Sequence, residues 1–291
     1  MSKFPGIFMT FIVALATSFL SVSYFSKQNH ETDRKNAYER ILDKGVLRCG
    51  YYVFPPALSI DPNTKEKTGF AVDITNEIAK KLHLKVEWTE EVTFGTMMPA
   101  LQANHFDAIC TPVWVNAAQG REVEYTRDLF YTPIVAVARQ EDMRFKDTNS
   151  FNSPSITLAT MDGEITSAIA ADDFPQAKTL AVPNNSDLSV LFTNVKNKKA
   201  DVTFTDLNAL ERFNKNNDNA LKNITPDYPV RIFPFTLAVQ KGEFELLSHL
   251  NYTITEMLYS GQIERIVRKH EIYPNSYLYI STPYRVDSLR K

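Results

Sequence analysis

The chain of 291 residues lacks several features that would point to particular classes of protein. Neither charge is in excess, because 32 Lys and Arg face 34 Asp and Glu. A nucleic-acid binder normally carries a basic excess or a basic face. There is no Gly-x-Ser-x-Gly elbow, phosphate-binding glycine loop or cluster of metal ligands, and the five histidines are scattered singly. We therefore expect no metal, no cofactor and no nucleic-acid partner.

Cysteine is scarce, with Cys49 and Cys110 alone. Neither follows the N-terminal apolar segment, where a lipid-bearing cysteine would have to lie, so a lipid anchor is excluded. Both lie in strand-like runs, and the favoured interpretation is two buried thiols that behave as small hydrophobes. An oxidising compartment would also allow a disulfide, which the sequence alone does not reveal.

The N-terminus carries the clearest local signal. Lys3 precedes an apolar stretch from Phe4 to Phe25, and a polar run follows at 27–35. This pattern is typical of a secretory signal peptide, with Ser21-Val22-Ser23 as a small-x-small cleavage site. The same 22 residues are long enough to remain as a membrane anchor. Either way the rest of the chain is predicted to be exported, with any membrane contact made by this segment.

Hydrophobic periodicity in the first half predicts alternating helices and strands. The expected elements are a helix at 36–42, a strand at 45–49, a helix at 73–82, a strand at 84–88, a helix at 96–103 and a strand at 107–111. Such an order implies a mostly parallel sheet covered by helices. Ligands bind beyond the carboxyl ends of strands in such sheets, so residues after Cys49 and after Cys110 become site candidates.

The same pattern restarts in the second half. The expected elements are strands at 155–159 and 200–204, helices at 164–171 and 188–196, connecting β-rich runs at 132–138 and 230–239, and final helices at 244–259 and 262–270. The Ser-Gly pair at 260–261 is a helix stop signal. The aromatic tail from Tyr273 onward gives no prediction.

Several fragments together resemble the amino-acid-type bacterial extracellular solute-binding family 3. They are Gly45–Gly50 with Pro55-Pro56, Gly69-Phe70-Ala71-Val72-Asp73, Phe94 with Met97–Leu101, Asp107-Ala108-Ile109, Ala200-Asp201-Val202 and Gly261–Ile266. They follow the family's order from about residue 45 to 271. The resemblance implies an α/β fold of the type II periplasmic-binding-protein (Venus flytrap) kind, in which two lobes close around one solute. Each lobe is expected to be a mostly parallel sheet flanked by helices.

The resemblance also implies a division of the chain. The expected parts are a signal peptide or anchor at 1–26, a linker and short helix at 27–44, lobe 1 at 45–133, lobe 2 at 134–234, a return to lobe 1 at 235–275 and a tail at 276–291.

The family's site residues carry over by position. Asp206 would be the partner of the ligand's ammonium, although it also suits the cap of a helix beginning at Leu207. Phe54 and Phe94 would be the stacking walls, with Tyr51 or Tyr52 beside them. Thr111, which follows the third strand, would offer its hydroxyl and backbone N–H.

The sequence departs from the family where the ligand carboxylate is held. Gln119 occupies the position of the arginine clamp, and Arg121 follows two residues later. Trp114 and Pro112 replace small polar residues. The second-lobe anion site reads Met161-Asp162-Gly163-Glu164, whose acids would repel an anionic ligand. These changes favour a cationic or neutral solute; in the alternatives, Arg121 substitutes and the ligand is an amino acid, or the site no longer binds solute.

The predicted function is therefore binding of a small polar solute, an amino acid or a cationic or neutral amine. A monomer in the periplasm would deliver it to the permease of an ATP-driven (ABC) importer. An enzyme is the first alternative, because cyclohexadienyl dehydratases share the fold and Glu164 or Asp206 would suit a general acid. The second is a ligand sensor tethered by the uncleaved N-terminal segment.

Overall fold

The computed structural model describes residues 36–117, 119–145, 148–274 and 276–279. The predicted signal or anchor at 4–25 and the end of the tail lie outside these residues. The chain divides into two units, residues 1–44 and 45–291, each of which is described by itself. In the described part of the chain, no helix has the length and hydrophobicity that crossing a membrane requires.

The first unit contains helix α2 (Ala37–Lys44), close to the predicted range. Its start is a capping box. The Asn36 Oδ1 atom accepts the amide of Glu39 at 2.8 Å, and Glu39 Oε2 accepts the amide of Asn36 at 3.2 Å.

The second unit is built on an eight-stranded sheet with the order β10-β7-β12-β5-β1-β4, to which β11 adds on β7 and β6 on β12. The strands are β1 (Val46–Tyr51), β4 (Lys85–Glu91), β5 (Ala108–Trp114), β6 (Val123–Tyr125), β7 (Phe130–Arg139), β10 (Thr203–Thr205), β11 (Leu221–Asn223) and β12 (Arg231–Gln240). As predicted, β1 is parallel to β4 and β5. However, β12 is antiparallel to both β5 and β7, so the sheet is mixed.

Two further pairs complete the strands. Strand β8 (Thr157–Met161) is parallel to β9 (Lys178–Val182), and the short β2 (Ser59–Ile60) is antiparallel to β3 (Lys67–Thr68). A parallel bridge from Leu158 to Val202 places β8 beside the segment that leads into β10. Sequence periodicity did not predict β2, β3, β6, β9 or β11, most of which are too short to show a repeat.

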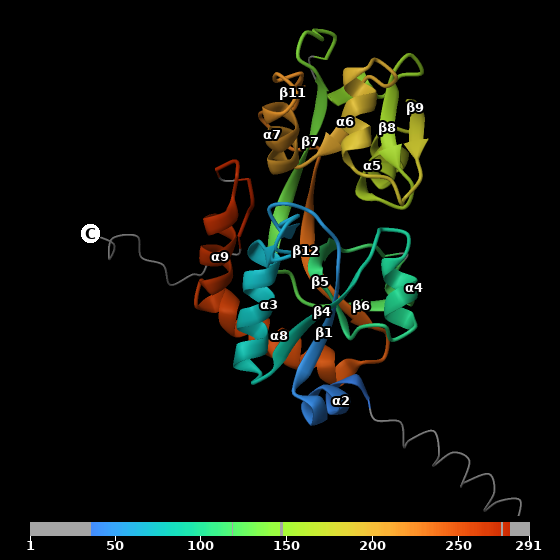
Figure 1. The fold of residues 1–291 in the computed structure, drawn as a ribbon. Coiled ribbons are helices and arrows are strands. Elements are labelled where there is room, and N and C mark those ends of the chain that lie inside the picture. Colours follow the sequence, from blue (N-terminus) through green and yellow to red (C-terminus); the bar gives the residue numbers. More distant parts are fainter. Residues whose placement is uncertain (1–35, 118, 146–147, 275, 280–291) are drawn as a thin grey trace, which may run out of the picture. The chain divides into compact units, whose positions relative to one another are not determined.

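The helices form two groups (Figure 1). In the first, α3 (Phe70–Lys81), α8 (Phe244–Tyr259) and α9 (Gln262–His270) pack on one another, and α4 (Met97–Gln102) packs on β1, β5 and β12. In the second, α5 (Ile165–Asp173), α6 (Ser189–Lys196) and α7 (Leu207–Lys215) pack on β7, β8, β10 and β11. Helices α8 and α9 have the predicted bounds, separated by Gly261 in the left-handed region at φ 68°. The unit is thus a two-lobed α/β fold, with β7 and β12 running between the lobes.

Each lobe has its own hydrophobic core. In addition, two short turns of 3-10 helix lie outside the two helix groups. Leu101, Phe106 and Ile109 are fully buried in the first lobe, and Leu158 and Phe204 in the second. The 3-10 turns are η1 (Gln119–Arg121) and η2 (Thr148–Phe151). The two lobes are therefore packed around separate cores and connected by β7 and β12.

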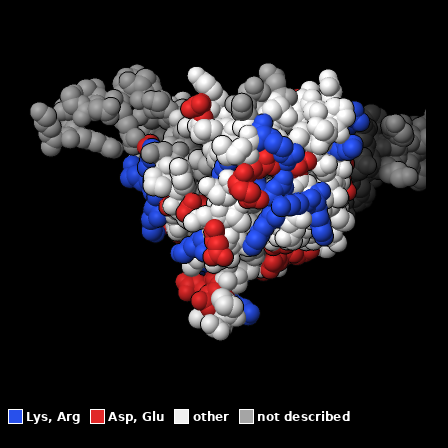
Figure 2. All heavy atoms as spheres, turned by 90° about the horizontal axis from the view of Figure 1, so that it is seen from above, with Lys and Arg blue, Asp and Glu red and all other residues white. Residues whose placement is uncertain are grey.

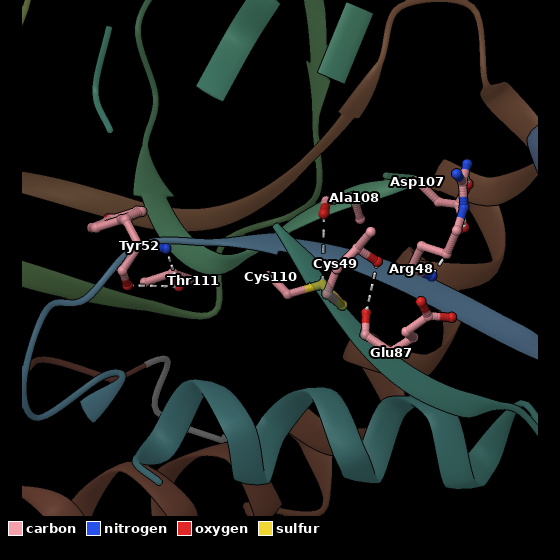
Figure 3. The surroundings of a disulfide bond; sticks show 9 residues. Arg48, Cys49, Tyr52, Glu87, Asp107, Ala108, Cys110 and Thr111 are labelled. Carbon is pink, nitrogen blue, oxygen red and sulfur yellow. Dashed lines mark hydrogen bonds and ion pairs between the residues drawn. A yellow bond between two sulfur atoms is a disulfide. The ribbon is translucent and has the colours of Figure 1, made fainter. Parts of the chain in front are cut away.

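The two cysteines form a disulfide, so the prediction of free thiols is wrong (Figure 3). They are 61 residues apart in sequence, but β1 and β5 are neighbours in the sheet, and the two Cα atoms lie 5.5 Å apart. That separation is within the range for a disulfide. Nearby, Nη2 of Arg48 on β1 pairs with Oδ1 of Asp107, the residue before β5, at 2.6 Å.

Charged side chains of opposite sign adjoin one another, both in a partly buried network and on the surface. In the second lobe, Arg139 and Arg144 share Asp142 and Asp201 in a four-membered network. Hydrogen bonding from Arg144 lowers the pKa of Asp142 to about 2. On the face drawn in Figure 2, basic and acidic side chains likewise lie side by side.

Candidate functional site

A pocket of about 640 Å³, part of it open to solvent, lies where elements of both lobes meet. It is lined from β5, β7, β10, β12, α5, α6 and α7 and from the loops after β1 and β4. Six of the ten predicted ligand residues line it, namely Tyr52, Phe54, Phe94, Trp114, Glu164 and Asp206. The carboxyl ends of β1 and β5 thus contribute to the site, as the sheet topology predicts.

The position of Tyr52 is fixed by β5 (Figure 3). The Thr111 hydroxyl accepts the Tyr52 amide at 3.2 Å and donates to the Tyr52 carbonyl at 3.1 Å. The Tyr52 hydroxyl donates to the Pro112 carbonyl at 2.7 Å. Burial, and secondly the charge of Glu164, raise the pKa of Tyr52. Thr111 therefore holds a wall of the pocket instead of lining it.

Glu164 is the N-cap of α5. Gly163, at φ 69°, makes the turn from β8, and Glu164 Oε2 then accepts the Thr166 amide at 2.8 Å. The side chain lines the pocket and is buried. Burial raises the pKa of Glu164 to about 7, against the hydrogen bonds from Thr166. The charge of Asp206 raises it further. Near neutral pH the free pocket therefore exchanges a proton at this carboxylate.

The raised pKa of Glu164 predicts a pH-dependent stability. Between its unfolded value of 4.5 and about 7, the folded state holds a proton that the unfolded state releases. The stabilisation is therefore complete below pH 4.5 and lost as the pH rises through 7, by about 3 kcal/mol. We expect Glu164→Gln to remove this loss. In urea unfolding, the free energy of unfolding of the variant should therefore rise relative to that of the wild type between pH 5 and pH 8. Glu122→Gln, at an exposed glutamate, is the control. If wild type and Glu164→Gln differed by the same free energy of unfolding at both pH values, the burial effect would be contradicted.

Asp206 caps a helix and lines the pocket, a position that is compatible with both roles that the sequence suggested. It is the N-cap of α7, with Oδ1 accepting the amides of Asn208 at 2.9 Å and Ala209 at 3.0 Å. It also lines the pocket and is buried. Burial raises the pKa of Asp206, although hydrogen bonds from the helix amides and the charge of Arg212 oppose the rise. Its Oδ2 atom is engaged by neither of the two capping amides.

Arg212 is the pocket cation that sequence reasoning missed. It lies on α7, three residues after Ala209, and both line the pocket and the wider cleft outside it, whose empty space is about 1610 Å³. Its Nη1 group donates to the Pro55 carbonyl in the loop after β1. Residues three apart share a helix face, so a helix capped by Asp206 could have indicated that Ala209 and Arg212 lie together.

A small rear cavity adjoins Asp206 and was also missed; its empty space, open solvent included, is about 230 Å³. It shares Phe54, Thr132, Asp206 and Phe235 with the main pocket. The Thr132 hydroxyl is buried and has no hydrogen-bond partner within the described residues. Tyr277, in the tail that gave no prediction, closes the cavity by packing edge-on against Phe70 and Phe130, with ring centroids 5.6 and 5.0 Å apart.

Four of the predicted residues do not line the pocket. Thr111 positions Tyr52, and Gly163 provides the turn before Glu164. Gln119 lies in η1, where its Oε1 atom accepts the Tyr125 hydroxyl at 3.2 Å, and Arg121 is exposed in the same turn. Among the side chains that the structure describes, no three His, Cys, Asp or Glu are grouped to hold a metal ion.

The fold and the pocket define the class of the protein. It is a two-lobed, type II solute-binding protein in which both lobes contribute to one small-molecule pocket. The model of the bacterial extracellular solute-binding proteins, family 3, matches residues 47–271, and the chain belongs to this family.

Individual relatives are distant but cover most of the chain. The glutamine-binding protein GlnH of Bacillus subtilis is 26% identical over 72% of this chain and 74% of its own. The L-cystine-binding protein TcyA of the same organism is 26% identical over 89% and 92%. Among solved structures, the ancestral amino acid-binding protein AncCDT-1, a precursor of cyclohexadienyl dehydratase, has a TM-score of 0.68 at 23% identity, covering 81% of this chain and 99% of its own. That likeness shows the fold alone.

Proposed function

We propose that this protein binds a small amine-type solute, an amino acid or another cationic or neutral amine, in the pocket. The observation that carries the proposal is a pair of buried carboxylates, Glu164 and Asp206, at an otherwise largely apolar wall. Burying two carboxylates is costly, and the charge of Arg212 offsets the rise in the pKa of Asp206 only in part. A solute's positive group would supply a further cation.

Arg212 changes the charge of the site from what the sequence suggested. The loss of the arginine clamp at Gln119 favoured a solute without a carboxylate. Arg212 lines both the pocket and the wider cleft, whereas neither Glu164 nor Asp206 lines the wider cleft. A zwitterion whose ammonium faces Asp206 and whose carboxylate faces Arg212 therefore fits as well as a simple cation.

We further propose delivery of the solute to an ABC importer. One of the relatives named above, GlnH of Bacillus subtilis, is an ABC transporter glutamine-binding protein. In a two-lobed protein, a solute that contacts both lobes stabilises the closed form, which a permease would recognise. The chain would act in the periplasm as a monomer after export through its N-terminal segment. We propose that residues 45–133 with 235–275 form the first lobe and residues 134–234 the second, so that each contains one of the two helix groups.

Binding is proposed in preference to catalysis. The curated relatives named above are binding proteins. Glu164, with its pKa of about 7, has the protonation that a general acid needs, but a dehydratase substrate carries carboxylates that two buried acids would repel. Incubation with a prephenate-like acid should therefore give no product, and its conversion would replace the proposal by the enzyme alternative.

A thermal-shift screen of the purified chain tests the proposal. Cationic, zwitterionic, neutral and acidic solutes are each added at millimolar concentration. A solute at 1,000 times its Kd stabilises the folded state by about 4 kcal/mol, which is readily seen in the melting temperature. We expect amines to raise the melting temperature and purely acidic solutes to leave it unchanged. Stabilisation by acidic solutes alone would contradict the proposal.

Substitutions of Arg212 and of Arg121 test which arginine binds the carboxylate of a zwitterionic solute. We expect Arg212→Ala to weaken binding of a zwitterionic solute about 10- to 100-fold, the range for losing one charge-assisted hydrogen bond, measured by titration calorimetry. Arg121→Ala and Gln119→Ala should bind as the wild type, because neither residue lines the pocket. The affinity for a solute without a carboxylate should fall less in Arg212→Ala. Loss of binding in Arg121→Ala alone would place the clamp at Arg121.

A further inference from the structure

The walls of the pocket are rich in aromatic rings. They come from loops after β1 and β4 and from the strands β5, β10 and β12. These rings belong to Tyr52, Phe54, Phe94, Trp114, Phe204 and Phe235. Tyr52 lies against Phe94, with ring centroids 5.1 Å apart, and against Phe54 at 6.2 Å. A solute in this pocket would therefore have ring surfaces on several sides.

The cation–π contacts that the structure describes within the protein involve other rings. Within the part of the chain that the structure describes, Lys or Arg groups lie over the rings of Tyr51, Tyr259, Phe145 and Tyr279. None of these four rings lines the pocket. Aromatic faces beside buried carboxylates form an environment that attracts an organic cation by cation–π interaction as well as by charge.

The rear cavity shows what surrounds the solute's nitrogen. Asp206 lines both the main pocket and the rear cavity, so a nitrogen held by its carboxylate lies at the junction of the two. On the rear side, Phe54, Phe70, Phe130 and Tyr277 supply aromatic surface, and Thr132 supplies one hydroxyl. A primary ammonium directs N–H donors that need acceptors, whereas a methyl group on the nitrogen fills apolar space.

We propose that the preferred solutes of this pocket are N-methylated ammonium compounds, with the methyl groups in the aromatic surroundings of Asp206. The inference rests on the proposed function and specifies the class of amine. A quaternary nitrogen keeps its charge for Glu164 and Asp206, needs no hydrogen-bond acceptor, and gains from the aromatic faces. A carboxylate on the same molecule would face Arg212.

Matched pairs of solutes test the inference by titration calorimetry on the purified chain. The pairs are choline and ethanolamine, glycine betaine and glycine, and Nε-trimethyllysine and lysine. In each pair that binds, we expect the methylated member to bind at least about tenfold more tightly, as for one desolvated cation–π contact. The inference is overturned if the primary amine binds as tightly in any pair, or if other amines bind and no methylated member does. If no amine of any kind binds, the proposed function itself fails.

Two variants locate the preference in the structure. Phe54 lines both the main pocket and the rear cavity. Phe54→Leu should therefore weaken binding of the methylated solute about tenfold while leaving binding of the primary amine nearly unchanged. Phe145→Leu, a half-buried ring outside the pocket, is the control. Ala57→Val narrows the rear cavity and should remove the preference without removing binding. Equal losses for both members of a pair in Phe54→Leu would overturn the assignment of the methyl groups to these rings.

Discussion

Replacing Asp206 by Asn is expected to reduce solute binding at least about 100-fold while leaving the fold intact. A buried charge that loses its partner costs about 2–5 kcal/mol, and here the solute's cation would lose the carboxylate it faces. The fold is spared because Asn caps a helix as well as Asp does, and its oxygen still accepts the amides of Asn208 and Ala209.

Thermal unfolding of Asp206→Asn without solute separates the two effects. Burial raises the pKa of Asp206, so the charged form is disfavoured in the folded protein. Removing that charge should leave the melting temperature unchanged or raise it at neutral pH. Asp162→Asn, at an exposed acid in the turn before α5, is the matched control and should bind normally. Normal solute binding by Asp206→Asn would remove this carboxylate from the site.

Loss of the Cys49–Cys110 disulfide is expected to cost about 4 kcal/mol in the free energy of unfolding. The bond closes a loop across a sequence separation of 61 residues, and such a loop restricts the unfolded chain by that amount in the chain-entropy model. The double variant Cys49→Ala/Cys110→Ala should therefore unfold at much lower urea concentration.

Wild type unfolded in urea with and without dithiothreitol is the control for the two substitutions. Reduction should shift the urea midpoint as the double variant does, because both remove the same cross-link. Thiol titration of the denatured, unreduced chain should detect no free cysteine. Two titratable thiols, or a double variant as stable as the wild type, would show that the bond does not form.

The order of the main elements could be predicted because each is long enough to show a hydrophobic repeat. Helix α8 buries Leu246, Leu250, Ile254 and Met257 at three- or four-residue spacing, and its bounds were predicted. The mixed character of the sheet was not, because the direction in which β12 pairs with β5 depends on how the chain returns between the lobes.

Part of the site could be predicted because strand ends converge. Tyr52 and Phe54 follow β1, Trp114 ends β5, and Asp206 follows β10, so the topology brings them together. Arg212 escaped prediction because its position depends on where α7 begins and which face it turns to the pocket. Tyr277 escaped because an aromatic tail has no periodicity that shows where it packs.

The disulfide illustrates the same limit in the sheet. Cys49 and Cys110 each lie in a run that reads as a buried strand, and a buried thiol fits such a run equally well. The bond depends on β1 and β5 being neighbours in a register that sets Cys49 opposite Ala108. That register depends on how the two strands pair in the folded protein, so it cannot be predicted from the sequence of either strand alone.

Proton release on binding shows directly whether the solute's positive group lies beside Glu164. The best-binding amine of the thermal-shift screen is titrated at pH 6.5 in phosphate and in PIPES, whose ionisation enthalpies differ and which carry no primary amine. At this pH roughly three quarters of the free Glu164 is protonated, since its pKa is about 7, and a neighbouring cation should expel that proton. We expect the binding enthalpy to differ between the buffers by that fraction of a proton, and the difference to vanish in Glu164→Gln. Equal enthalpies in both buffers for the wild type would contradict an amine bound beside these carboxylates.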